Sequence, residues 1–418
     1  MIPDLGGLLD HQNLERASRL LCELTEANRS GKARRTRTDE KDVDFELIAL
    51  RHGEVLTRNG RACPLPSRNV SAVDSTPRRS FASDNTAPIA PEILQAIVDA
   101  NAGDAIAYGA DPWTARAVAC LREHLGEDTD IYFTFNGTGA NVAALSSLLQ
   151  PWESVLAPAT AHLQTDECGA LERFSGSKVV PIATSDGKLR PSDVEPYLRG
   201  GHDVHFSQPR ALSISQAPEF GGIYEIEELR ELCRFAHDRG LIVHLDGARL
   251  ANAAAALGTD LRAASRGAGV DVLSFGGTKN GLMLGEAICF FNPGLHREAA
   301  PFVQKQSMQL ASKMRYIAAQ FVALLTDDRW LRYATHANAM AQRLFERVRA
   351  IEGVRVTRPV RCNAIFATLD RDAIEAIQRD FFFYIFDEAL PEVRWMTHWA
   401  TAERDVAEFA NCIQRATA

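Results

Sequence analysis

The stretch EIEELRELCRFAHDRGLIVHLDGAR, which runs from Glu225 to Arg249, decides the fold class. Its first part has apolar residues at helical spacing, at Ile226, Leu229, Leu232, Cys233 and Ala236. This periodicity predicts an amphipathic helix over Glu225–Arg239, and Gly240 marks its end. The apolar run Leu241–Leu245 follows at once and is typical of a buried strand. A helix that leads directly into a buried strand favours an α/β architecture.

The same alternation of helices and short strands extends over most of the chain after Ser80. We expect six further strands, at Ile131–Phe135, Ser154–Ala157, Val179–Ile182, Ala211–Ser215, Val270–Phe275 and Ala287–Phe291. Regular alternation of this kind predicts a mostly parallel sheet with helices on its faces. Helical patterns at Ala140–Leu149 and Pro301–Leu325 complete a large domain that we place over residues 80–325.

The two ends of the chain differ from this central part. Residues 326–418 predict a smaller C-terminal α+β domain, with helices at Asn338–Ala350 and Asp372–Gln378 and strands at Val354–Thr357 and Ala364–Leu369. Residues 1–79 contain a basic cluster and a stretch rich in Ser, Pro and Arg. We interpret them as a poorly ordered N-terminal extension without recognisable chemistry.

The composition is that of a folded enzyme. Of the 418 residues, 46% are hydrophobic and 24% are charged, close to the averages for globular proteins. The net charge of -8 argues against a nucleic-acid partner. No apolar run approaches the roughly 18 to 20 residues that cross a bilayer, so we expect no membrane partner. The eight cysteines form no CxxC pair, so we expect core thiols, no metal site and a cytoplasmic location.

Candidate chemistry collects directly after four of the predicted strands, where ligands of open α/β sheets bind. One strand is followed by the turn NGTG (Asn136–Gly139), whose small residues at the start of a helix suit a phosphate group. The same residues can also form only a tight turn. They are a poor dinucleotide fingerprint, because Val142 occupies the third small position, and they lack the lysine of a P-loop.

Three other strand ends each present one reactive side chain: His162, Asp246 and Lys279. His162 is either a structural loop residue or a group that stacks on a flat cofactor or acts as a base. Asp246 needs a cationic partner at the tip of a buried strand, and Arg249 can provide it. Lys279 lies among glycines and is either a solvated surface residue or an accessible amine that forms an imine.

Together these four positions make up the set that pyridoxal phosphate requires. The cofactor needs an amine, a carboxylate against its pyridine nitrogen, an anion cradle for its phosphate and a flat group over its ring. Chance rarely places all four at the strand ends of one sheet. We therefore predict a pyridoxal-phosphate enzyme. The rival interpretation is a non-catalytic phosphate- or nucleotide-binding module in which Lys279 only contacts a phosphate.

Six segments of the chain carry a family pattern. They are SFASDN (Ser80–Asn85), AYGADP (Ala107–Pro112), FNGTGAN (Phe135–Asn141), HLDGARLANA (His244–Ala253), LSFGGTKNG (Leu273–Gly281) and VRWMTH (Val393–His398). In these segments the chain resembles the low-specificity L-threonine aldolases, which have the aspartate-aminotransferase-like fold of pyridoxal-phosphate enzymes (fold type I). The resemblance runs from about Phe81 to the C-terminus, and the pair LDGAR and GGTKNG is its most specific part.

The resemblance implies a role for each matching residue of the cofactor site. Lys279 matches the lysine that forms the imine with the cofactor, and Asp246 matches the aspartate that keeps the pyridine nitrogen protonated. His162 matches the histidine that stacks on the ring and is the candidate base. The phosphate cradle and a nearby acid of the family motif are matched by Gly137, Thr138 and Glu167.

The resemblance also implies a substrate site, with one departure. Ser83, Arg249 and Arg394 match the groups that hold the substrate carboxylate, and Arg249 also counts among the cofactor-binding residues. Where the better-known family members have Glu-Asn-Thr-His, this chain has Gln216-Ala217-Pro218-Glu219. A second substrate-side histidine is therefore absent, and Glu219 or a water can replace it.

For the reaction, the resemblance implies retro-aldol cleavage of L-threonine, L-allo-threonine and related β-hydroxy-α-amino acids to glycine and an aldehyde. Alternatives on the same scaffold are a preference for phenylserine, a β-elimination or a transamination, because fold and cofactor do not fix the bond that breaks. The resemblance further implies a homo-oligomer, either a dimer or a homotetramer, and a place in threonine catabolism and glycine biosynthesis.

Overall fold

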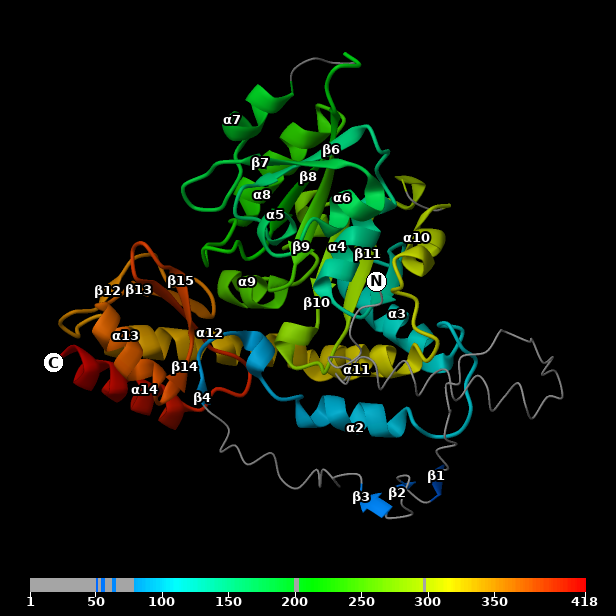
Figure 1. The fold of residues 1–418 in the computed structure, drawn as a ribbon. Coiled ribbons are helices and arrows are strands. Elements are labelled where there is room, and N and C mark those ends of the chain that lie inside the picture. Colours follow the sequence, from blue (N-terminus) through cyan, green and yellow to red (C-terminus); the bar gives the residue numbers. More distant parts are fainter. Residues whose placement is uncertain (1–49, 52–53, 57–61, 65–78, 199–202, 296–297) are drawn as a thin grey trace, which may run out of the picture. The chain divides into compact units, whose positions relative to one another are not determined.

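The computed structural model describes residues 50–51, 54–56, 62–64, 79–198, 203–295 and 298–418 (Figure 1). The chain divides into two units, Met1–Ser75 and Thr76–Ala418. In the first unit, three short strands form an antiparallel sheet: β1 (Leu50–Arg51), β2 (Glu54–Leu56) and β3 (Ala62–Pro64). The other residues before Arg79 lie outside the described part of the chain. The predicted lack of order of the N-terminal extension therefore stays a prediction.

The second unit is built on a seven-stranded sheet. Its strands are β5 (Asp130–Thr134), β6 (Glu153–Pro158), β7 (Lys178–Ile182), β8 (Gln208–Ser215), β9 (Ile242–Gly247), β10 (Val272–Gly276) and β11 (Glu286–Phe290). They lie in the order β5-β11-β10-β9-β8-β6-β7. Only β11 runs antiparallel to its neighbours in this sheet. Each strand coincides with one of the seven predicted from the sequence, and the α/β class with a mostly parallel sheet is confirmed.

Helices cover both faces of this sheet (Figure 1). Val243 and Leu245 of β9 pack in a core that includes α3 (Pro112–Leu125), α8 (Ile226–His237) and α11 (Arg315–Leu325), whereas Ile242 packs with α4 (Gly137–Ser146) and α6 (Ala170–Ser175). Successive strand residues point to opposite faces, so these two cores lie on opposite sides. The other helices here are α2 (Pro91–Asp99), α5 (His162–Thr165), α7 (Pro191–Val194), α9 (Leu250–Leu257) and α10 (Ala300–Gln306).

One predicted helix is wrong in its extent. The sequence pattern predicts a helical stretch over 301–325, but the structure interrupts it between α10 and α11. At Met308 the backbone has φ of 63°, which helical residues do not adopt. The side chain of Gln309 then reaches back, and its Oε1 accepts a hydrogen bond from the backbone N of Phe135 at 3.0 Å. This tertiary contact just before α4 competes with helix continuation and is invisible to a periodicity argument.

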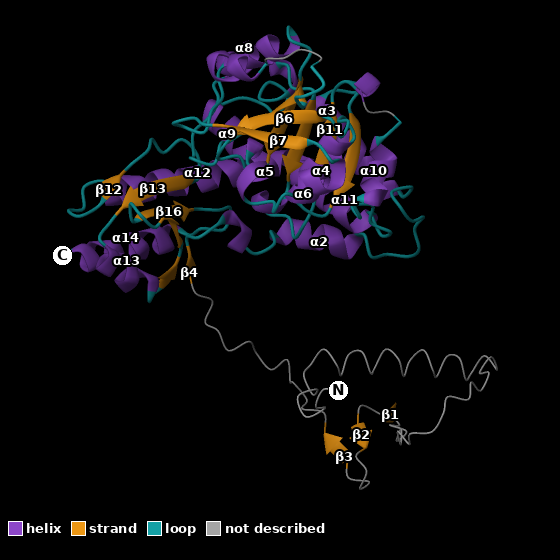
Figure 2. Cartoon of the chain, turned by 45° about the horizontal axis from the view of Figure 1, so that its top comes forward, coloured by secondary structure: helices purple, strands orange, loops and turns teal. Residues whose placement is uncertain are grey.

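The C-terminal part has its own sheet and core (Figure 2). The antiparallel strands β12 (Arg355–Val356), β13 (Ala364–Thr368), β16 (Glu392–Met396) and β15 (Tyr384–Asp387) pack with the helices α12 (Arg329–Val348), α13 (Arg371–Gln378) and α14 (Glu403–Thr417). The predicted helices and strands after residue 326 match these elements to within a few residues, except that α12 begins earlier. The boundary between two domains at 325/326 stays a prediction.

The start of the second unit is attached to this C-terminal part. β4 (Arg79–Ser80) pairs in parallel with β14 (Phe381–Phe382). Phe81 lies in the C-terminal core and stacks on Phe409 with ring centroids 4.1 Å apart. The segment that carries Ser83 is therefore held by residues from the other end of the chain. Of the helices in the described ranges, none is both long enough and apolar enough to cross a bilayer.

Candidate active site

The sheet topology brings the predicted reactive residues to one edge. Strands β10, β9, β8 and β6 are consecutive neighbours and run parallel. Their carboxyl ends are followed, in that order, by Lys279, Asp246 (which lies within the end of β9), Glu219 and His162. β5 runs in the same direction on the far side of β11 and leads into Gly137 at the start of α4. The four predicted strand-end positions thus belong to one edge of one sheet.

Asp246 is held as a carboxylate by two hydrogen bonds. Its Oδ2 accepts from Nδ2 of Asn141 at 2.9 Å, and its Oδ1 accepts from the backbone N of Ala248 at 2.9 Å. Burial alone raises the pKa of Asp246, but the Lys279 ammonium and these hydrogen bonds outweigh it, so the pKa lies below its usual value. Asp246 is therefore ionised and suited to hold a proton on a cationic ring nitrogen.

Lys279 follows β10 in the short turn η5 (Thr278–Asn280) and is half-buried. Burial lowers the pKa of its amine, and the nearby Arg249 guanidinium lowers it further, whereas Asp84, Asp246 and Glu286 oppose this. A lysine with a lowered pKa spends more time as the neutral amine, which is the nucleophilic form. The environment of Lys279 therefore suits covalent chemistry rather than a solvated surface role.

His162 is the first residue of α5, and its ring is paired with a buried acid. Its Nδ1 donates to Oε1 of Glu167 at 2.9 Å, and this hydrogen bond raises the pKa of His162. The pairing also leaves Nε2 as the nitrogen available to a substrate. Glu219 lies beside it, because its Oε1 accepts from the backbone N of His162 at 3.1 Å and from Oγ of Ser215 at 2.7 Å. Burial raises the pKa of Glu219.

Arg249 does not pair with Asp246, which was the simple alternative open from the sequence. Its Nε donates to Oδ2 of Asp84 at 2.7 Å, and its Nη2 donates to Oδ1 at 2.8 Å. Asp84 also accepts from Nδ2 of Asn363 at 3.1 Å. Burial of Asp84 raises its pKa, but Arg249 and the hydrogen bonds lower it to about 2. A bidentate ion pair of this kind fixes the plane of the guanidinium.

Arg394 on β16 provides the second guanidinium. Its Nε is buried and has no hydrogen-bond partner among the described residues. Burial lowers the pKa of Arg394, and the proximity of Arg249 lowers it further. Asp84 pairs with Arg249, whereas Nε of Arg394 keeps a donor without a partner among the described residues. Such a site suits the carboxylate of a small ligand.

The start of α4 is open in the way that a phosphate cradle requires. Asn136 caps the helix, and its Oδ1 accepts from the backbone N of Gly139 at 2.8 Å. A Cβ atom built at Gly137 meets no other atom within 4 Å. The first backbone N–H groups of a helix have no partner within the helix and attract anions. Gly137 and Thr138 are the first two residues of α4, and their predicted role as a phosphate cradle stays a prediction.

Four polar residues of this region were missed at the sequence level: Asp84, Asn141, Glu286 and Asn363. Glu286 on β11 is buried. Its Oε2 accepts a hydrogen bond at 2.8 Å from the backbone N of Gly277, the residue directly before η5. Burial raises the pKa of Glu286 to about 7. Asp84 and Asn141 stand within quoted motifs, but nothing in the sequence indicates which distant residues they contact.

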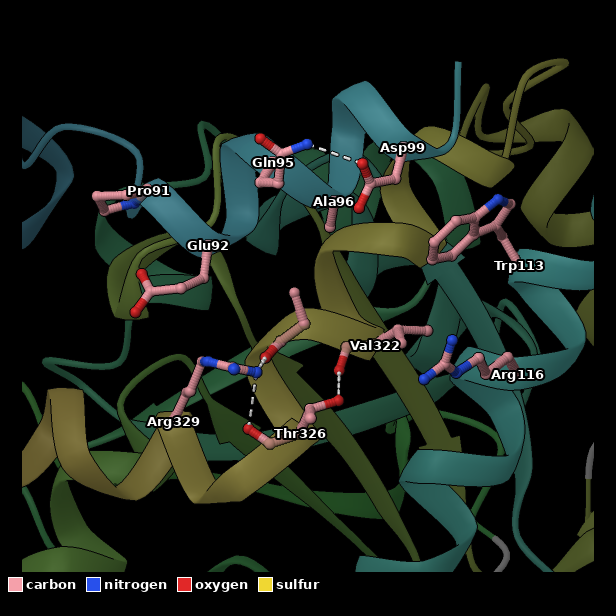
Figure 3. A pocket seen from close by; sticks show the side chains of 11 residues that line it. Pro91, Glu92, Gln95, Ala96, Asp99, Trp113, Arg116, Val322, Thr326 and Arg329 are labelled. Carbon is pink, nitrogen blue, oxygen red and sulfur yellow. Dashed lines mark hydrogen bonds between the residues drawn. The ribbon is translucent and has the colours of Figure 1, made fainter. Parts of the chain in front are cut away.

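A separate surface groove lies away from these residues. It has a volume of about 500 Å³ and lies between α2, α3, α11 and the start of α12 (Figure 3). Trp113, Arg116 and Arg329 are among its lining residues, and none of the predicted site residues contributes to it. The groove has no nucleophile or paired acid and base of the kind seen at the sheet edge, so we assign the chemistry to the sheet edge.

Comparisons with known proteins identify the family of this chain. The family described as beta-eliminating lyase matches residues 80–372. A low specificity L-threonine aldolase of Pseudomonas aeruginosa is 45% identical over 340 residues, which cover 80% of this chain and 97% of the relative. A low specificity L-threonine aldolase of a Pseudomonas sp. is 44% identical over 334 residues, or 79% of this chain and 96% of the relative.

Solved structures that resemble this chain include a threonine aldolase and an aspartate aminotransferase. A threonine aldolase of Leishmania major superposes with a TM-score of 0.77 at 32% identity, covering 81% of this chain and 100% of that structure. An aspartate aminotransferase of Thermus thermophilus shares the fold with a TM-score of 0.57 at 17% identity, covering 81% of this chain and 92% of the other.

Proposed function

The chain belongs to the beta-eliminating lyase family, and from this premise we propose that it is an aldehyde-lyase of the threonine aldolase type. The family depends on pyridoxal phosphate. The proposed reaction cleaves L-threonine, L-allo-threonine and related β-hydroxy-α-amino acids to glycine and an aldehyde, which is acetaldehyde for threonine. The observation that carries the proposal is the row of Lys279, Asp246 and the His162–Glu167 pair along one sheet edge.

The residues present fit the cofactor. Lys279 supplies the amine, Asp246 the carboxylate for the ring nitrogen, and the open start of α4 at Gly137 and Thr138 the phosphate cradle. His162 supplies the flat group over the ring. Bound pyridoxal phosphate supplies an electron sink for the electron pair of the breaking Cα–Cβ bond.

The remaining steps fall to the chain's own residues. Arg394, Arg249 and Ser83 bind the substrate carboxylate, and Asp84 keeps the Arg249 guanidinium in one plane. His162 removes the proton of the β-hydroxyl at Nε2, while Glu167 stabilises the resulting imidazolium through Nδ1. The Cα–Cβ bond breaks, the aldehyde leaves, and a proton returned to Cα gives glycine. Asp246 holds the ring nitrogen protonated throughout.

A visible spectrum and a coupled aldehyde assay test the proposal. The purified protein is mixed with pyridoxal phosphate, its visible spectrum is recorded, and L-threonine is added in the presence of alcohol dehydrogenase and NADH. We expect a yellow protein that releases acetaldehyde and glycine in equal amounts. 2-Oxobutanoate and ammonia in place of glycine and acetaldehyde would indicate β-elimination of threonine. Aldehyde release from phenylserine but not from threonine would show that phenylserine is the preferred substrate. A colourless protein would contradict the cofactor.

The finer properties are part of the same proposal. We propose a homo-oligomer, either a dimer or a homotetramer, without a nucleic-acid or membrane partner, that acts in threonine catabolism and glycine biosynthesis. We also propose a cytoplasmic location, which is supported by six cysteines that are free thiols in the described part of the chain. Light scattering of the holoenzyme during gel filtration measures the subunit number directly.

A further inference from the structure

The side chain of Asn141 joins two acids of the candidate site. Asn141 is buried on α4, with 2% of its surface exposed. Its Nδ2 donates to Oε1 of Glu167 at 2.9 Å and to Oδ2 of Asp246 at 2.9 Å. An amide nitrogen carries two hydrogens, so both are used. The opposite orientation of the amide would place its oxygen against two carboxylates, which fixes the orientation observed.

The connection continues to the candidate base. The same Oε1 of Glu167 also accepts from Nδ1 of His162 at 2.9 Å. A continuous series of hydrogen bonds therefore runs from His162 through Glu167 and Asn141 to Asp246. It links the residue proposed to move the substrate proton with the residue proposed to hold the cofactor ring nitrogen.

Charge explains why a neutral donor is needed at this place. Glu167 and Asp246 each lie within hydrogen-bond distance of the same nitrogen atom, so their like charges are close. The Asn141 amide stabilises both without adding charge. Around His162, the hydrogen bond and charge of Glu167 and the charge of Asp246 raise its pKa, whereas burial and Lys279 lower it. Glu219 contacts the backbone N of His162.

We propose that Asn141 is a positioning residue of this site, an inference that rests on the proposed function. By bonding to both carboxylates, it keeps Glu167 directed at His162 and Asp246 directed at the cofactor ring. Asn141 lies one helical turn after Gly137 on α4, and residues four apart share a helix face. The helix that carries the phosphate cradle therefore also sets the relative placement of base and acid.

The substitution Asn141→Asp tests this, because it keeps the shape and removes the amide hydrogens. An added carboxylate beside Glu167 raises the pKa of His162, so the acid limb of the kcat/KM profile for threonine should move up by about one pH unit. Loss of a donor to Asp246 should also weaken pyridoxal phosphate binding about tenfold in a fluorescence titration of the apoenzyme.

Asn252 offers a matched control. It is a buried helical asparagine on α9, but its Nδ2 donates to Oδ1 of Asn338 at 3.1 Å rather than to a carboxylate. Asn252→Asp should lower stability and leave both the acid limb and the cofactor affinity unchanged. If Asn141→Asp instead lowers activity by the same factor at every pH and keeps the cofactor affinity, Asn141 is only structural and the inference is overturned.

A double-mutant cycle tests whether Asn141 acts on His162 through Glu167. In a Glu167→Gln background, the change Asn141→Ser, which adds no charge that could act on His162 directly, should no longer move the acid limb. A shift that persists would contradict action through Glu167. If Asn141→Asp does not fold, Asn141→Ser provides the same two measurements with smaller shifts of the same sign. If the wild-type protein cleaves no threonine, the proposed function fails, and the cofactor titration alone decides the inference: weaker binding supports it, and unchanged binding overturns it.

Discussion

At the scale of single residues, Lys279 is the position on which the chemistry depends most. We predict that Lys279→Ala abolishes the imine absorbance of the bound cofactor and lowers turnover of threonine by at least about 10³-fold, because residues 277–285, between β10 and β11, contain no other lysine. Absorbance spectra and a coupled aldehyde assay measure both effects. A variant that keeps both the imine absorbance and the activity would contradict the assignment of Lys279.

Asp246 and Arg394 should have distinguishable kinetic effects. Asp246→Ala removes the charge that holds the ring nitrogen protonated and should lower kcat about 10²-fold or more with little change in KM. Arg394→Ala removes a charged hydrogen-bond donor of the carboxylate site and should raise KM about 10²-fold with a smaller effect on kcat. Steady-state kinetics with threonine separate the two effects. A reversed pattern would mean that the roles are exchanged, and equal effects of both variants on kcat and KM would contradict separate roles.

The raised pKa of Glu286 makes the free energy of unfolding depend on pH. Burial raises its pKa from 4.5 to about 7, so the folded protein keeps a proton that the unfolded chain loses. Between these pH values the free energy of unfolding therefore falls as the pH rises, and the loss is complete above about pH 7. Glutamine carries no charge at any pH, so Glu286→Gln should restore up to about 3 kcal/mol of the free energy of unfolding that Glu286 costs at high pH. The variant should therefore gain more stability at pH 8 than at pH 5.

Urea unfolding at the two pH values measures this difference. Glu231→Gln on the exposed side of α8 is the control, and it should show no pH-dependent gain. An equal effect of Glu286→Gln at pH 5 and pH 8 would show that Glu286 is ionised in the folded protein.

The sequence predicts the residues of this site better than it predicts their partners. Lys279, Asp246, His162 and Gly137 follow predicted strands, and parallel strand ends must meet at one edge. The partner of Arg249 could not be found in this way. Asp84 is distant in sequence, and only the attachment of its segment to the C-terminal part brings it to Arg249.

At the scale of elements, the spacing between β9 and β10 depends on a glycine. A Cβ atom built at Gly276 lies 2.5 Å from the backbone O of Ala248, in the turn after Asp246. Gly276→Ala should therefore push the Lys279 turn away from the Asp246 turn, lower the melting temperature by several degrees and weaken cofactor binding. Calorimetry and cofactor titration measure both, and Gly137→Ala, which has open space, is the control for stability.

Elements were predictable where the pattern is local. All seven strands of the large sheet follow from apolar runs with turn residues at their ends, and α8 follows from its helical stripe and its glycine stop. The break between α10 and α11 does not, because Gln309 ends the helical path by bonding to Phe135 across the fold. Contacts between distant segments decide such boundaries, and periodicity carries no information about them.

At the scale of the whole molecule, residues 1–78 should be dispensable for catalysis. None of the proposed site residues lies among them, whereas Arg79–Ser80 pairs with β14 and Phe81 packs in the C-terminal core. A protein that begins at Arg79 should keep kcat and KM for threonine within about twofold, since it retains every residue proposed to bind or act on the substrate. Steady-state kinetics of the truncated and full-length proteins compare them. A large loss of activity would assign the N-terminal residues a part in the active enzyme.

The attachment of Phe81 has a mechanical consequence. The backbone O of Phe81 accepts from the backbone N of Met396 at 2.7 Å, and its backbone N donates to O of Phe382 at 2.8 Å. Ser83 lies two residues beyond Phe81, and Arg394 lies two residues before Met396. The same backbone hydrogen bonds therefore hold the segments of Ser83 and Arg394, two of the residues proposed to bind the substrate carboxylate. We therefore expect the affinity for the substrate to depend on how well the C-terminal core packs around Phe81, although the substrate does not contact that core.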